Sequence, residues 1–137
     1  MGTDCRKDSA GAEVIHLPYP PSINRLYRSI NGRSILSKVG RDYYRAAVPV
    51  AEATGINVLG PYVLAITAYR PDRRKRDIGN LEKIVSDTLT KAGVIEDDSF
   101  CEAIISRWAC SGVAVNFSEA AADLPVIHVE LGAPNAN

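Results

Sequence analysis

One segment, residues 78–92, constrains the fold more than any other part of the sequence. Its apolar residues recur at spacings of three and four, and Gly93 follows as a helix terminator; the stripe comprises Ile78, Leu81, Ile84, Val85, Leu89 and Ala92. An amphipathic helix of this kind must bury its stripe against another layer. Asn80, Lys83 and Asp87 share the opposite flank, and Asp77 stands before the first turn, where its side chain could cap the helix.

The remaining patterns predict a sheet to receive this helix. Strands are predicted over residues 14–17, 62–69, 100–108 and 126–131. A second helix is predicted from the N-cap candidate Ser37 to about residue 54, with Pro49 as an interruption or kink. Prolines 18, 20 and 21 predict a rigid, extended connection, and Asn31-Gly32 predicts a tight turn. The order β-α-β-α-β-β predicts an α+β domain, a mixed β-sheet with two helices packed on one face.

Length and composition agree with a single domain. The chain has 137 residues, of which 46% are hydrophobic and 23% charged, as in ordinary globular proteins. We expect a domain over residues 13–132 between flexible tails at residues 1–12 and 133–137. No membrane span or secretory signal is recognisable, and the three cysteines lack the spacing of a zinc site or a disulfide framework. A cytoplasmic protein without a membrane partner is expected.

Charge is unevenly divided, although it sums to zero. Residues 25–91 hold thirteen Lys or Arg against six Asp or Glu, whereas residues 92–137 hold one against seven. Five of the cations fall within seven residues: Arg70, Arg73, Arg74, Lys75 and Arg76. Such a run is either a solvated turn or a surface for phosphate groups.

Carboxylates stand on both sides of the helix at residues 78–92. Asp77 precedes it, and Glu96, Asp97 and Asp98 follow it. Clustered carboxylate oxygens suit Mg²⁺ or Mn²⁺; the alternatives are a plain helix cap and an exposed acidic turn. Because the helix would be roughly 24 Å long, Asp98 can approach Asp77 only if the chain turns back, for example as a strand antiparallel to the helix.

Three segments together resemble the RusA family of Holliday-junction resolvases, over about residues 17–107. They are PYPPSINRLYR, NGR and RPDRRKRDIGNLEKIVSDTLTKAGVIEDDS. The resemblance implies a small homodimer that binds four-way branched DNA and cuts two strands symmetrically, in DNA recombination and repair. It also implies a nuclease that uses Mg²⁺ or Mn²⁺ held by aspartates. Asp77 and Asp98 match these aspartates and Lys83 matches an essential lysine, so these three are the expected catalytic residues.

One position departs from the family pattern. The family reads Asp-x-Asp-Asn where this chain reads Asp77-Ile78-Gly79-Asn80, and Gly79 has no carboxylate. Asp97 is the expected spare metal ligand. Two hypotheses follow: a metal-dependent nuclease that cleaves four-way junctions, or a junction-binding protein whose catalysis is impaired at Gly79.

The expected DNA contacts come from two parts of the chain. Arginine, lysine and asparagine side chains fix register on DNA through its phosphates without reading sequence. The candidates are Asn24, Arg25, Arg28, Arg33, Arg73, Arg74, Lys75, Arg76 and Asn80. Alternatively, Pro20, Pro21 and Asn24 form only a structural turn. Pro71-Asp72 is also found in another nuclease superfamily, but no Asp/Glu-x-Lys follows at a useful distance.

Overall fold

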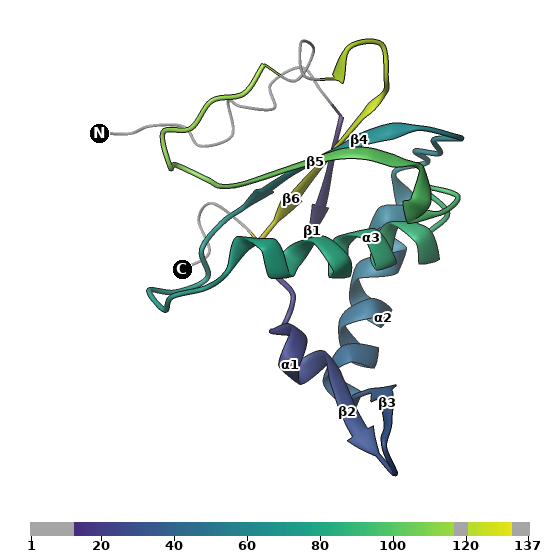
Figure 1. The fold of residues 1–137 in the computed structure, drawn as a ribbon, viewed down its shortest axis with the longest axis vertical. Coiled ribbons are helices and arrows are strands. Elements are labelled where there is room, and N and C mark those ends of the chain that lie inside the picture. The colour runs from purple at the N-terminus through teal and green to yellow at the C-terminus, as the bar shows by residue number, and fades with distance from the viewer. Residues whose placement is uncertain (1–12, 117–120, 133–137) are drawn as a thin grey trace.

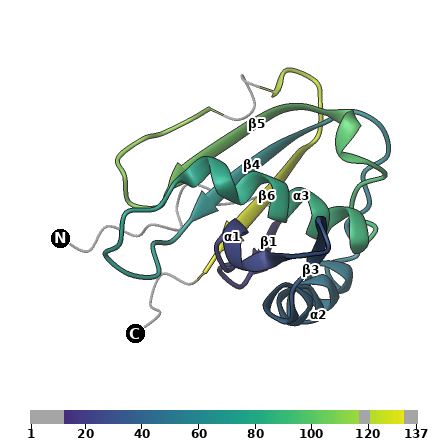
Figure 2. The same ribbon diagram turned by 60° about the horizontal axis from the view of Figure 1, so that its bottom comes forward.

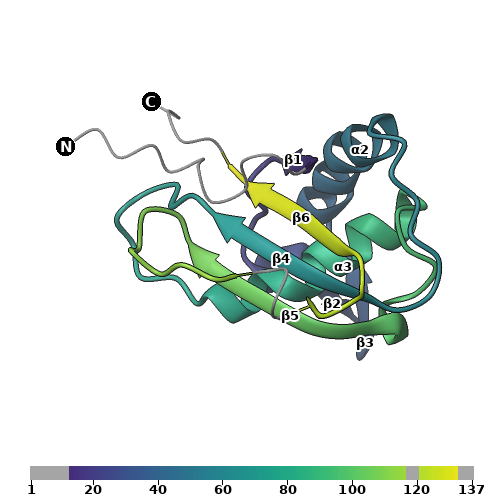
Figure 3. The same ribbon diagram turned by 90° about the horizontal axis from the view of Figure 1, so that it is seen from above.

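The computed structural model describes residues 13–116 and 121–132. Its main layer is a four-stranded sheet whose strands, in spatial order, are β1 (Val14–Leu17), β6 (Val126–Leu131), β4 (Tyr62–Ala68) and β5 (Cys101–Trp108). Helices α2 (Lys38–Ala53) and α3 (Leu81–Lys91) lie on one face of this sheet (Figure 1 and Figure 3). The expected α+β class, with two helices packed on one face of a sheet, is confirmed.

The strands of the main sheet are all parallel, which corrects the expected mixed sheet. The chain passes from β4 to β5 through α3, the kind of crossover that parallel neighbours require. Within the described residues, antiparallel pairing is confined to a separate hairpin of β2 (Tyr27–Ile30) and β3 (Arg33–Leu36). Hydrophobic patterning reports which residues are buried, but it does not report which strands pair or in which direction.

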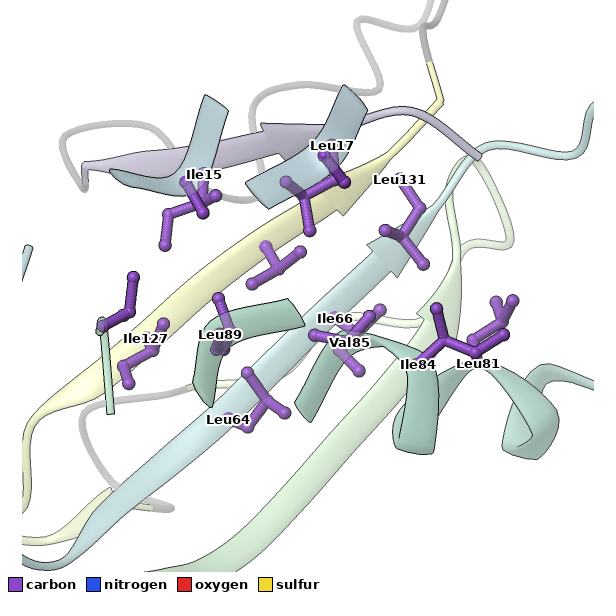
Figure 4. Close-up of a cluster of buried hydrophobic side chains, with 14 of the residues drawn as sticks. Ile15, Leu17, Leu64, Ile66, Leu81, Ile84, Val85, Leu89, Ile127 and Leu131 are labelled. Carbon is purple, nitrogen blue, oxygen red and sulfur yellow. The ribbon is translucent and has the colours of Figure 1, made fainter. Parts of the chain in front are cut away.

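The apolar stripe of α3 packs on the sheet as its spacing predicts. The close-up shows side chains of α3 directed toward β4; the labelled residues include Leu81, Ile84, Val85 and Leu89 on the helix and Leu64 and Ile66 on the strand (Figure 4). All six are at most 5% exposed, and burial of each stabilises the fold by about 1.5–3 kcal/mol. The first turn of the helix predicted over residues 78–92 is a 3₁₀ turn at Ile78–Asn80. The packing therefore fixes which flank of α3 faces outward.

Helix α2 begins at the predicted cap. The Ser37 hydroxyl oxygen accepts a hydrogen bond from the Gly40 N–H at 3.0 Å, and the same hydroxyl is 2.6 Å from the carbonyl of Arg25. Pro49 lies inside the helix, which continues to Ala53. Gly40 is required by a close approach, because a Cβ there would lie 2.5 Å from the carbonyl oxygen of Leu26. The start of α2 is thus fastened to the segment before the hairpin.

The segment after β1 contains more regular structure than predicted. A short helix, α1 (Ile23–Leu26), follows the prolines. The predicted tight turn at Asn31-Gly32 joins β2 to β3, and both residues have positive φ, 51° and 75°, as in a type I′ hairpin. The hairpin projects at the end of the molecule opposite the main sheet (Figure 1).

The structure bears on three further expectations. Cys101 is a free thiol, whereas Cys110 is disulfide-bonded, a bond that the argument from cysteine spacing did not anticipate. No helix in the described part of the chain is long and apolar enough to cross a bilayer. The expected tails at residues 1–12 and 133–137 lie outside the described residues, so the domain limits stay a prediction.

Candidate functional site

Two adjoining hollows lie where the proline-rich segment after β1 meets the start of α3. The larger, of about 540 Å³, includes Arg25 and Arg74 in its lining. The smaller, of about 80 Å³, includes Asn24, Asp77 and Asn80. Both are lined by Tyr19, Pro20, Pro21, Ser22 and Arg76. We call the two together the motif groove, because the fold here unites two sequence motifs that lie far apart in the chain.

Asp77 caps the 3₁₀ turn and remains exposed. Its Oδ1 accepts a hydrogen bond from the Gly79 N–H at 2.9 Å. The capping role and a ligand role are compatible, because a carboxylate has two oxygens with several acceptor sites. At Gly79, an added Cβ would meet only Asp77 Oδ1, at 3.3 Å. An aspartate therefore fits at position 79 with a small adjustment of the Asp77 side chain.

Lys83 and Asn80 stand at the same end of α3 as Asp77. The Lys83 ammonium lies 3.5 Å from Asp87 Oδ2, and its side chain is 60% exposed. The N-terminus of a helix favours anionic groups through its dipole and its unpaired N–H groups. Asp77 and Asn80 thus line the motif groove, whereas Lys83 does not line it and its ammonium pairs with Asp87.

The basic loop before Asp77 is organised by an acid that sequence reasoning did not select. Asp72 accepts two hydrogen bonds from Arg76, at 3.1 and 2.7 Å, and lies 3.7 Å from the guanidinium of Arg74. The bond from Arg76 is the main reason that the pKa of Asp72 lies below its ordinary value. Arg76 also lies over the ring of Tyr19, 5.5 Å from its centroid. The i,i+4 spacing of Asp72 and Arg76 was the available signal.

The other cations of the loop differ in their surroundings. Arg70 stacks over the ring of Trp108 at 4.2 Å. Arg73 and Lys75 are exposed. Farther away, Arg28 and Arg33 lie on the β2–β3 hairpin and are exposed. Of the nine expected DNA-contacting residues, five therefore line the motif groove and two lie on the hairpin. Arg73 and Lys75 belong to the basic loop but do not line the groove.

The acidic segment after α3 is held in place by its own hydrogen bonds. Glu96 Oε1 accepts the N–H of Gly60 at 2.9 Å, so this acid has a structural role. Asp97 caps a 3₁₀ turn at Asp98–Phe100 and accepts the Ser99 hydroxyl at 3.0 Å. That hydrogen bond from Ser99 is the main reason that the pKa of Asp97 lies below its ordinary value. Asp98 itself is exposed.

Within one chain, Asp77 and Asp98 lie at opposite ends of α3. β5 does run antiparallel to α3, as Ser106 near its end shows by lying 3.3 Å from Glu82 near the helix start. However, Asp98 precedes β5 instead of following it, so the returning strand carries the chain away from Asp98 (Figure 2). The helix is about 16 Å long. No group of three His, Cys, Asp or Glu in the described ranges is arranged to hold a metal ion. A single chain thus leaves the expected ligands apart.

Comparison with known proteins agrees with the motifs that line this groove. The family model described as "Endodeoxyribonuclease RusA" matches residues 18–123. Crossover junction endodeoxyribonucleases of Enterobacteria phage 82, of Shigella sonnei strain Ss046 and of Escherichia coli strain K12 are each 40% identical to this chain over 87 residues. These alignments cover 62% of this chain and 72% of each relative. The chain therefore belongs to the RusA family of endodeoxyribonucleases.

Proposed function

We propose that this protein is a structure-selective endodeoxyribonuclease that resolves Holliday junctions by paired, symmetric nicks, acting in recombination and repair in the cytoplasm. The observation that carries the proposal is the motif groove, where Asn24 and Arg25 from one motif meet Arg76, Asp77 and Asn80 from the other. Family membership supports the same activity. The groove offers cations and amides for phosphates beside an exposed carboxylate, the combination that phosphodiester hydrolysis needs.

We further propose that the reaction depends on Mg²⁺ or Mn²⁺. The donor set fits these hard cations, since Asp77, Asp97 and Asp98 offer carboxylate oxygens. A bound ion of this kind would supply an activated water and neutralise charge on the phosphoryl oxygens. Asp77 and Asp98 are the proposed principal ligands, and Asp97 is the spare one.

The placement of the acids supports a homodimer whose sites are shared. β5 is an edge strand of the main sheet, and it carries Ile104, which is 38% exposed. Pairing two β5 edges antiparallel about a two-fold axis would lay the two α3 helices side by side in opposite directions. The partner's Asp98 would then approach Asp77, because the start of one helix would face the end of the other. One dimer would thus hold two equivalent sites, as two symmetric cuts require.

The remaining side chains would bind and orient the scissile strand. Arg25, Arg74 and Arg76 would contact phosphates along the motif groove, and such contacts make affinity depend strongly on salt. The Lys83 ammonium, which is exposed in the first turn of α3, would stabilise the extra negative charge of the transition state. Its ion pair with Asp87 limits the directions in which the ammonium can point.

Gly79 supports a second candidate function, a junction-binding protein with impaired catalysis. The position lies two residues after Asp77, where the family pattern has an aspartate. The cation-lined groove does not depend on this residue, so binding would persist. The space around Gly79 accepts a side chain. Gly79→Asp therefore distinguishes an active nuclease from a junction-binding protein with impaired catalysis.

The test is cleavage of a labelled four-way junction with Mg²⁺ or Mn²⁺ by the protein and by Gly79→Asp, with Gly79→Asn as an uncharged control of similar size. The nuclease proposal predicts paired nicks by the unsubstituted protein and a faster reaction in Gly79→Asp only. Binding without nicks, with cleavage gained in Gly79→Asp, would instead favour the binding protein. Failure of the protein to bind the junction would contradict both.

A further inference from the structure

The β2–β3 hairpin presents an apolar and basic face to solvent. Arg28 pairs with Ile35 and Ile30 pairs with Arg33 in its register, and side chains two apart on a strand share a face. Arg28, Ile30, Arg33 and Ile35 therefore lie on one side of the ribbon. Ile30 and Ile35 are 36% and 40% exposed. Each exposed isoleucine lies opposite an arginine on this face, so the face suits a partner that is both anionic and partly apolar.

The hairpin is held at both ends, by a tight turn at its tip and by contacts with α1 and α2 at its base. Its tip is a two-residue turn with both backbones in the left-handed region, Asn31 and Gly32, which closes the strands tightly. At its base, the N–H of Ser37 bonds to the carbonyl of Leu26 at 2.8 Å. Gly40 of α2 approaches the same carbonyl so closely that no side chain fits between them. The base of the hairpin is therefore joined directly to α1 and α2.

The β2–β3 hairpin follows directly after α1, which contributes to the motif groove. α1, which carries Asn24 of the groove, ends at Leu26, and β2 begins at the next residue. From there the four residues of β2 extend about 13 Å, and the hairpin projects beyond α1 and α2 (Figure 1). A DNA strand bound in the groove would thus have the hairpin face within a few nucleotides of it.

The positive charge of the hairpin and its neighbouring segments indicates which class of molecule the hairpin face would bind. Residues 23–41 contain five cations, Arg25, Arg28, Arg33, Lys38 and Arg41, and no acid. A nucleic acid satisfies both parts of the face: its phosphates pair with the arginines, and its base faces accept apolar side chains once a stack is opened. In an intact duplex these base faces are covered by neighbouring pairs, whereas at a branch point the stack is interrupted.

We propose that the β2–β3 hairpin inserts Ile30 and Ile35 against the unstacked base pairs at the centre of a branched DNA, and that this insertion makes binding selective for branches over plain duplex. The inference rests on the proposed function, whose substrate it refines. Arg28 and Arg33 supply phosphate contacts that are common to both kinds of DNA. The isoleucines supply the contact that only the branch offers.

The test uses Ile30→Ser/Ile35→Ser in the full-length protein, with Val50→Ser as a matched control. Val50 is 42% exposed on α2, away from the hairpin, and serine and valine have similar helix propensities. A four-way junction carrying 2-aminopurine beside the branch reports unstacking, in Ca²⁺ to suppress cleavage. Binding to the junction and to a duplex of the same sequence is measured in parallel.

The double variant is expected to keep its duplex affinity within about twofold and to lose about tenfold in junction affinity, with little fluorescence gain. Val50→Ser should behave as the unsubstituted protein does. Equal junction affinity and fluorescence in the double variant would overturn the hairpin proposal alone. A change of oligomeric state in that variant would also overturn it, since the face would then be an interface between copies. If the unsubstituted protein showed no preference for the junction, the proposed function would fail as well.

Discussion

At the scale of a single residue, the proposed roles of catalysis and DNA binding can be tested separately at Lys83. Its ammonium is exposed, lies in the first turn of α3 and pairs with Asp87, and it does not line either hollow of the motif groove. A cation in this place can act on charge that develops in the transition state without contributing much to ground-state affinity.

We therefore expect Lys83→Gln to slow junction cleavage by about 100-fold while junction affinity changes by less than about twofold. Single-turnover cleavage and binding in Ca²⁺ measure the two quantities separately. Arg45→Gln, at an exposed cation of α2, is the control and should leave both near their starting values. Equal losses in cleavage and affinity on Lys83→Gln would show that the lysine only holds DNA.

Sequence reasoning selected the residues of the groove but not their partners. The PYPPSINR and RPDRRKRDIGN motifs led to Asn24, Arg76, Asp77 and Asn80, which the structure places around one groove. Tyr19 was missed because a ring beneath a guanidinium is a contact in space. Asp72 was missed although its i,i+4 spacing from Arg76 was a signal in the sequence. The roles assigned to Asp77, Lys83 and Asp98 stay predictions.

At the scale of secondary-structure elements, the junction between the hairpin and α2 depends on Gly40. Alanine is favoured over glycine inside a helix by about 1 kcal/mol. Here the added methyl would lie 2.5 Å from the Leu26 carbonyl oxygen and 2.8 Å from a methyl of Leu36. Because backbone and a packed side chain must both shift, the clash outweighs the propensity.

Gly40→Ala is expected to lower the free energy of unfolding by about 1–3 kcal/mol, as overpacking does elsewhere. Urea unfolding followed by circular dichroism measures the change. Glu52→Ala, at an exposed position of the same helix, should stay within about 0.5 kcal/mol of the parent. A gain in stability on Gly40→Ala would contradict the close approach.

The main helices and strands were predictable because each has a local sequence pattern. The way in which the strands pair was not predictable from such patterns. The stripe of α3, the cap at Ser37 and the β-branched run at residues 62–69 each report a local environment. The short hairpin strands carry only one partly buried residue each, Tyr27 and Leu36, so burial left no pattern there. Parallel pairing depends on contacts between strands far apart in the chain, which local patterns do not encode.

At the scale of the whole molecule, the proposed dimer places the β5 edges together. Ile104 is exposed on this edge strand, and a charge at the centre of an apolar contact between copies is costly to desolvate. Ile104→Asp is expected to convert a dimer into a monomer and to abolish paired nicking, whereas Val50→Asp should do neither. Light scattering on the eluting protein gives the mass. A dimer that survives Ile104→Asp would place the interface elsewhere.

The central claim is that two copies of the chain share each nuclease site. The direct test mixes Asp77→Asn with Asp98→Asn, allows subunits to exchange, and follows cleavage of a four-way junction in Mg²⁺. The parent is whichever of the unsubstituted protein and Gly79→Asp cleaves faster. In a mixed dimer one shared site would contain both substitutions and the other neither, so roughly a quarter of the sites should be intact. We predict that each variant alone is inactive and that the mixture nicks single strands. An inactive mixture, with an active parent and confirmed exchange, would contradict the shared site.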